Sequence, residues 1–128
     1  MNIFSCSRNQ LTTLDISKNI TLTQVSCSNN KLNQLDISKN NALISLYCSE
    51  NLFTYFDLTQ NSNLKYFAIS FNNLTSLDVT QNTALVQLYV ENNNITTLNL
   101  NNNTALELLS CMNNQLTSLD ITNSNKLK

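Results

Sequence analysis

The sequence predicts a repeat solenoid, in which short parallel β-strands stack on one or both faces with little or no α-helix. A motif that begins at Leu11 returns every 21 residues without insertion or deletion. Inside each copy, apolar and polar residues alternate over a few positions, which is typical of a short strand. One copy has too few apolar residues to bury its own edge, so stability requires copies stacked on one another. Each copy should therefore form one coil.

The copies keep the same phase through all 128 residues. They start with the segments LTTLDISKN, LNQLDISKN, FTYFDLTQN, LTSLDVTQN, ITTLNLNNN and LTSLDITNS. We expect one domain over 1–128, with a half coil at 1–10 followed by coils at 11–31, 32–52, 53–73, 74–94, 95–115 and 116–128. The array begins and stops within the pattern and has no polar cap at either end, which predicts a fragment of a longer array.

Each copy divides into two halves of the form LxxLxLxxN, as the stretch from Leu85 to Asn103 illustrates. Over residues 4–127 the full pattern, LxxLxCxxNxLxxLDLxxN, resembles the short bacterial class of leucine-rich repeat proteins. The resemblance implies one parallel strand centred on Asp15 and its equivalents, and another around the Cys-bearing positions on the opposite side. Because both sides are equally thin, we expect a nearly straight right-handed coil.

Two columns of asparagine mark the places where the chain turns. Asparagine tolerates the left-handed backbone conformation, and its amide can bond backbone groups that a turn leaves unpaired. Stacked amides can also bond one another as a ladder. We therefore predict a structural role for Asn9, Asn30, Asn51, Asn72, Asn93 and Asn114, and for Asn19, Asn40, Asn61, Asn82 and Asn103.

Four cysteines, Cys6, Cys27, Cys48 and Cys111, share one inward column in which the other coils carry Ile69 and Val90. A column that accepts Cys, Ile and Val is a small hydrophobic slot. Side chains on adjacent parallel strands point the same way, which is poor geometry for a disulfide, so we predict free buried thiols.

The composition excludes several kinds of function. The chain has no His and no Gly, so it lacks the commonest acid–base group, the commonest zinc ligand and glycine-rich phosphate loops. We therefore predict no enzyme activity and no cofactor. Charged residues make up 12% of the chain and the net charge is -1, which argues against a nucleic-acid partner. Neither a long apolar run nor a signal peptide is present, so we expect no membrane insertion.

One outward face, here called the Asp face, carries a row of aspartates at Asp15, Asp36, Asp57 and Asp78. We expect these carboxylates to bond neighbouring hydroxyls and backbone amides. A weaker alternative is Ca²⁺ bound between coils, although a single row of Asp offers few of the six to eight oxygens that the ion prefers. Ice binding by the nearby threonines is a further minor alternative.

The other outward face, here called the Tyr face, lies beside the cysteine column. Its candidate partner-binding residues are Tyr47, Tyr66, Tyr89, Phe71 and Leu108. Tyr surrounded by Ser is typical of adaptable recognition surfaces, but outward aromatic residues also stabilise sheets through cross-strand pairs. Both interpretations remain open, and we expect Tyr66 to lie diagonally between Tyr47 and Tyr89.

These observations favour a non-enzymatic interaction or adhesion module whose Tyr face binds a protein or a glycan. The family resemblance implies an extracellular or cell-surface location. The alternative is a structural solenoid that self-associates end to end, because exposed end coils have open strand edges.

Overall fold

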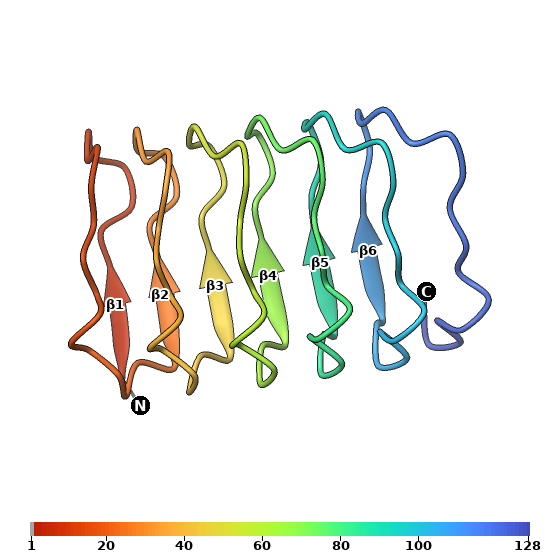
Figure 1. The fold of residues 1–128 in the computed structure, drawn as a ribbon, viewed down its shortest axis with the longest axis horizontal. Helices are drawn as coiled ribbons and strands as arrows, with labels where there is room; N and C mark the ends of the chain where they lie inside the picture. The colour runs from red at the N-terminus through yellow and green to blue at the C-terminus, as the bar shows by residue number, and fades with distance from the viewer. Residues whose placement is uncertain (1) are drawn as a thin grey trace.

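The computed structural model describes residues 2–128 and contains six short parallel strands in one sheet (Figure 1). The strands are β1 (Ile3–Ser5), β2 (Gln24–Ser26), β3 (Ser45–Tyr47), β4 (Tyr66–Ala68), β5 (Gln87–Tyr89) and β6 (Leu108–Ser110). Each is only three residues long, because the coil turns soon after the apolar–polar alternation ends. No helix occurs between residues 2 and 128. The predicted fold class is confirmed.

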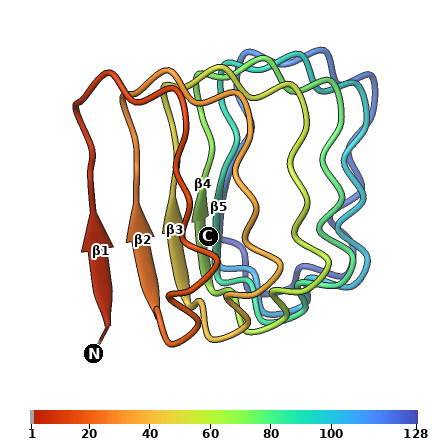
Figure 2. The ribbon, with the colours of Figure 1, turned by 60° about the vertical axis from the view of Figure 1, so that its left-hand side comes forward.

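The strands pair in chain order, and the register never shifts. Leu46 at the centre of β3 lies between Val25 of β2 and Phe67 of β4, and all three side chains are buried. The residues on either side of each central position point outward and form the Tyr face. Figure 2 shows the strands on one side of the coil and the returning segments on the other.

The predicted second row of strands around Asp15 and its equivalents does not form, and that expectation was wrong. In each coil except the fifth an Asp accepts a hydrogen bond from the backbone two residues ahead, as in Ser17 N to Asp15 Oδ1 at 2.9 Å. This bond occupies an N–H group that a strand ladder would need, and the chain turns directly after it. The Asp face is therefore extended chain without a ladder.

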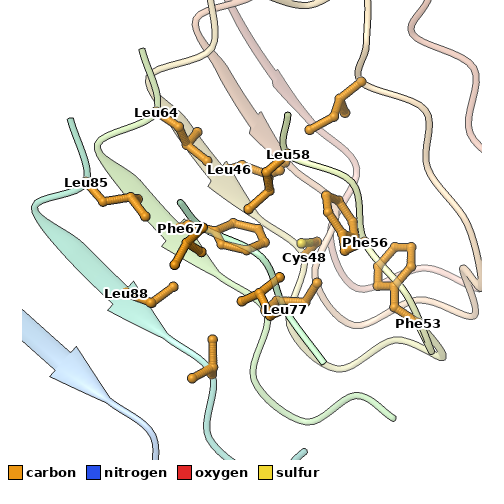
Figure 3. Packing of buried hydrophobic residues seen from close by; sticks show 14 of the residues in the cluster. Leu46, Cys48, Phe53, Phe56, Leu58, Leu64, Phe67, Leu77, Leu85 and Leu88 are labelled. Carbon is orange, nitrogen blue, oxygen red and sulfur yellow. The ribbon is translucent and has the colours of Figure 1, made fainter. Parts of the chain in front are cut away.

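A single hydrophobic core fills the interior of the coils, with the bulkiest side chains at its centre (Figure 3). Phe56 packs edge-on against Phe53 with ring centroids 5.0 Å apart, and its ring lies 5.6 Å from that of Phe67. In the second coil Leu32, Ile37, Leu43, Leu46 and Cys48 are buried in this core, and Leu35 is half-buried against it.

The first asparagine column ties adjacent coils together through the main chain. Asn51 Nδ2 donates to Cys48 O at 3.1 Å and to Cys27 O of the preceding coil at 3.1 Å. Its Oδ1 accepts from Leu32 N at 3.0 Å. The structural role of this column is clear, but the left-handed residues are the ones just before it, at Arg8, Asn29, Glu50, Phe71, Asn92 and Asn113, with φ between 54° and 59°.

The second column also bonds to main chain, and the predicted ladder between side-chain amides does not form. Asn61 Nδ2 donates to Asn40 O at 3.0 Å and to Ile37 O at 3.3 Å. The amides of Asn40, Asn82 and Asn103 donate to main-chain carbonyls of the preceding coil in the same way. Within residues 2–128, the Oδ1 atoms of Asn40, Asn61, Asn82 and Asn103 are buried and have no hydrogen-bond partner.

The cysteines are free, as predicted. Cys27 and Cys48 are buried, whereas Cys6 and Cys111 are half-buried in the end coils. Burial raises the pKa of Cys27 to about 12 and that of Cys48 well above its ordinary value, with a further rise from the neighbouring thiol in each case. Both buried thiols are therefore protonated at neutral pH and act as apolar side chains.

Candidate functional site

The three tyrosines of the Tyr face lie on consecutive strands. Tyr47 and Tyr89 occupy the same row, with Ala68 of β4 between them. Tyr66 belongs to the next row, where it pairs with Ser45 and Gln87. Tyr66 thus lies diagonally between Tyr47 and Tyr89, as expected, and all three side chains are half-buried.

The residues paired with the tyrosines across the sheet are small or polar. Ser45, which pairs with Tyr66, is only 9% exposed although it points outward. Ala68, which lies between Tyr47 and Tyr89 in their row, has only a methyl side chain. The Tyr89 hydroxyl donates to Gln87 Oε1 at 3.4 Å. The patch combines aromatic area with polar groups at its rim.

Phe71 lies in the turn that follows β4 and is 56% exposed. Its φ is 56°, in the left-handed region that costs a residue with a Cβ roughly 1–2 kcal/mol. The same turn position in the other coils carries only Asn, Arg or Glu. Leu108, at the start of β6, is 36% exposed and pairs with Gln87. Leu108 is thus on the strand next to that of Tyr89, Phe71 is in the turn beyond the strand of Tyr66, and Phe71 is the more exposed of the two.

Glu91 is a polar residue of this surface that the sequence pattern did not single out. Its carboxylate accepts a hydrogen bond from Ser70 Oγ. Burial raises the pKa of Glu91, and hydrogen bonds from Ser110 and Ser70 lower it. The hydrogen bonds have the larger combined effect, so the pKa of Glu91 is below its ordinary value. Ser fills this position in the half coil and in the first three coils, and the change to Glu in the fourth coil was the available signal. Glu91 places one fixed negative charge beside Tyr89.

On the opposite side, the aspartates of the Asp face are held in one orientation by local bonds. Asp57 Oδ1 accepts from Thr59 N at 2.9 Å and from Thr59 Oγ1 at 2.7 Å. Backbone and side-chain hydrogen bonds from Thr59 lower the pKa of Asp57. The same Asx arrangement occurs at Asp15, Asp36, Asp78 and Asp120. Across residues 2–128 there is no group of three or more His, Cys, Asp or Glu placed to hold a metal ion.

Tyr55 is the one aromatic residue in its column on the Asp face, and the sequence analysis did not select it as a candidate site residue. Its side chain is 68% exposed, while the equivalent positions carry only Thr, Gln or Ser. Open hollows of about 620 Å³ and 330 Å³ flank it on its two sides. Phe56 forms part of the floor of both hollows. The available signal was a single aromatic residue in an otherwise polar column.

The fold defines a parallel β-solenoid with a leucine-rich core, an inward asparagine column at each turn and a short strand in each coil. Solved structures with this arrangement are leucine-rich repeat proteins, and the chain is a leucine-rich repeat protein with a 21-residue repeat. No family model and no curated protein matches the sequence.

Three solved structures illustrate the similarity. The functional domain of InlJ from Listeria monocytogenes is 35% identical, with a TM-score of 0.80 over 99% of this chain and 33% of that one. The leucine-rich repeat protein LIC12759 of Leptospira interrogans is 28% identical, with a TM-score of 0.94 over 100% of this chain and 36% of that one. The internalin inlF from Listeria monocytogenes shares the fold at 21% identity, with a TM-score of 0.82 over 100% of this chain and 46% of that one.

The InlJ domain is described as including a cysteine ladder, and here Cys6, Cys27 and Cys48 occupy one column in three successive coils. The present chain spans about a third of the length of the first two solved chains. The part of the chain that the structure describes contains no helix long and apolar enough to cross a membrane.

Proposed function

We propose that this chain is a non-enzymatic interaction or adhesion module that binds a macromolecular partner, a protein or a glycan, through its Tyr face. The observation that carries the proposal is the placement of Tyr47, Tyr66 and Tyr89 on three consecutive strands with their rings partly exposed. Tyr gives a large contact area at a low cost in conformational entropy, because only two side-chain torsions must be fixed.

The shape of the Tyr face favours a protein partner over a glycan. The two hollows described above lie on the Asp face, whereas the tyrosines lie side by side on three consecutive strands of the sheet. Specific protein interfaces are typically broad surfaces with aromatic residues near the centre and polar groups at the rim. The half-buried side chains of Gln87 and of the ionised Glu91 supply polar groups beside the tyrosines. In keeping with the family resemblance, we place this function outside the cell or at the cell surface.

The test screens the purified chain against a panel of secreted and cell-surface proteins by biolayer interferometry. Each binding partner is then measured against a triple variant, Tyr47→Ser, Tyr66→Ser and Tyr89→Ser. We expect the Kd to rise at least about thirtyfold, because central aromatic residues dominate such interfaces. The matched control is Ser17→Lys on the Asp face, which should leave the Kd within about twofold. Partners whose binding survives the triple variant would refute the role of the Tyr face.

Self-association is a second candidate, favoured by exposed apolar side chains in the two end coils. Ile3 is 50% exposed at the open edge formed by β1, and Leu119 and Ile121 are 38% and 50% exposed in the last coil. A second copy that stacks on either end would cover them and pair an open strand edge. Light scattering over a hundredfold range of concentration tests this candidate. A constant mass of 14.4 kDa would exclude it, and growth with concentration would support it.

A further inference from the structure

The Asp face holds an exposed aromatic ring between two hollows, a feature that the Tyr-face function does not use. Among residues 2–128, Tyr55 is the most exposed of the large hydrophobic side chains, at 68%. Its equivalents in the neighbouring coils are Gln34 and Ser76, so the fold does not need an aromatic residue at this position. An exposed ring whose removal costs the core nothing is available for a ligand.

The two hollows have apolar floors and polar rims. Leu14, Leu35 and Phe56 contribute to the larger hollow, and Phe56 and Leu77 contribute to the smaller one. Their volumes, about 620 Å³ and 330 Å³, lie in the range of sites for small ligands, roughly 300–1,000 Å³. Sites of this composition bind ligands that have both apolar and polar surface.

The polar groups at the rim are fixed hydrogen-bond acceptors. Asp57 and Asp78 each use Oδ1 to accept from a backbone N–H at 2.9 Å and a Thr hydroxyl at 2.7 Å. Their second oxygens remain able to accept from a ligand. Because Thr59 and Thr80 donate their hydroxyl protons to the carboxylates, their oxygens also face a ligand as acceptors. The rim therefore favours a ligand rich in hydroxyl donors.

We propose that the Asp face contains a binding site for an uncharged oligosaccharide, centred on Tyr55. One face of a pyranose ring carries C–H groups that pack on an aromatic ring, while its hydroxyls donate to the fixed carboxylates. The hollows extend across five successive coils, from Thr13 to Thr97, which accommodates several sugar units. An anionic saccharide would be repelled by the carboxylates.

The experiment is an NMR titration of the ¹⁵N-labelled chain with four uncharged oligosaccharides: cellohexaose, maltohexaose, hexa-N-acetylchitohexaose and mannohexaose. We expect at least one of them to shift backbone resonances around Tyr55, Phe56 and Ser76. Tyr55→Ser should raise the Kd about tenfold or more, and Tyr55→Phe should bind like the original chain because the ring carries the contact. Tyr55→Ser should fold normally, since Ser76 and Ser118 occupy the same column.

Three results would overturn the proposal. The first is that no oligosaccharide shifts any resonance at about 10 mM. The second is that Tyr55→Ser binds as tightly as the original chain, or that the shifts fall on the Tyr face. The third is that a Lys-rich peptide binds the Asp face in a salt-sensitive manner while the oligosaccharides do not, which would show simple charge attraction. Tyr66→Ser is the matched control and should leave oligosaccharide binding unchanged, so this test is independent of the Tyr-face function.

Discussion

The two asparagine columns should differ sharply in their contribution to stability, although both are buried and both turn the same coils. Asn72 and Asn61 belong to the same coil and are 7% and 1% exposed. If burial alone set the cost of truncation, Asn61→Ala would be the more damaging change. The hydrogen bonds predict the opposite order.

Asn72→Ala removes bonds to three carbonyls, but each carbonyl keeps another donor. Cys48 O keeps Asn51 Nδ2, Ile69 O keeps Asn93 Nδ2, and Ser70 O keeps Glu50 N. The buried N–H of Phe53 has no such replacement, because its hydrogen bond is to Asn72 Oδ1 at 3.0 Å. Leaving that group unpaired costs about 1–3 kcal/mol, so with the lost bonds we expect about 2–4 kcal/mol.

Asn61→Ala leaves no backbone group unpaired. Ile37 O keeps Asn40 N and Asn40 O keeps Leu43 N. The change also removes a buried Oδ1 that has no partner within residues 2–128. The loss of two bonds, at about 1 kcal/mol net each, is thus partly offset by removal of an unpaired acceptor. We expect a cost of about 1 kcal/mol or less.

Urea unfolding followed by far-UV circular dichroism measures both free energies, with the slope m as a check on two-state behaviour. The exposed neighbour Asn73→Ala is the control and should change stability by less than about 0.5 kcal/mol. Equal costs for Asn72→Ala and Asn61→Ala, or a larger cost for Asn61→Ala, would refute the reasoning from unpaired groups.

Three further predictions concern the core, the Asp face and the cysteines. Phe67→Ala should lower the free energy of unfolding by about 3–5 kcal/mol in urea, whereas Phe71→Asn should not lower it, because asparagine tolerates the left-handed turn at φ 56°. The pKa of Asp57 is lowered on folding, so its carboxylate stabilises the fold above pH 3.8 and that contribution is lost as the pH falls further. Asp57→Asn should reduce the loss of stability between about pH 7 and pH 3, and an unchanged loss would contradict this. Cys111 should react with Ellman's reagent in the folded protein, while Cys48, whose pKa burial raises well above 9.0, should react only on unfolding. Equal rates would show that the interior opens readily.

Sequence alone determined the coil, its 21-residue period and the inward positions. In a solenoid the same positions of every coil are buried, so the buried positions recur with the sequence period. Six copies of one apolar pattern therefore define one register in which the coils stack. The same register predicted free cysteines, because side chains at equivalent positions of adjacent parallel strands point in the same direction, which is poor geometry for a disulfide. The diagonal placement of Tyr66 also followed from the period, because alternation decides which residues share a row.

Tertiary structure decided which groups complete the hydrogen bonds of the turns. The periodic pattern suggested strands around Asp15, but the carboxylate bonds the Ser17 amide that a ladder would need. It also suggested left-handed asparagines, whereas the turn places the residue before Asn72 in that region, even when that residue is Phe71. Residues from several coils line each hollow beside Tyr55, so the sequence of one repeat does not predict the hollows. The repeated sequence determines the backbone path and the buried positions that all coils share. Contacts between neighbouring coils determine the hydrogen bonds and surface hollows in which the coils differ.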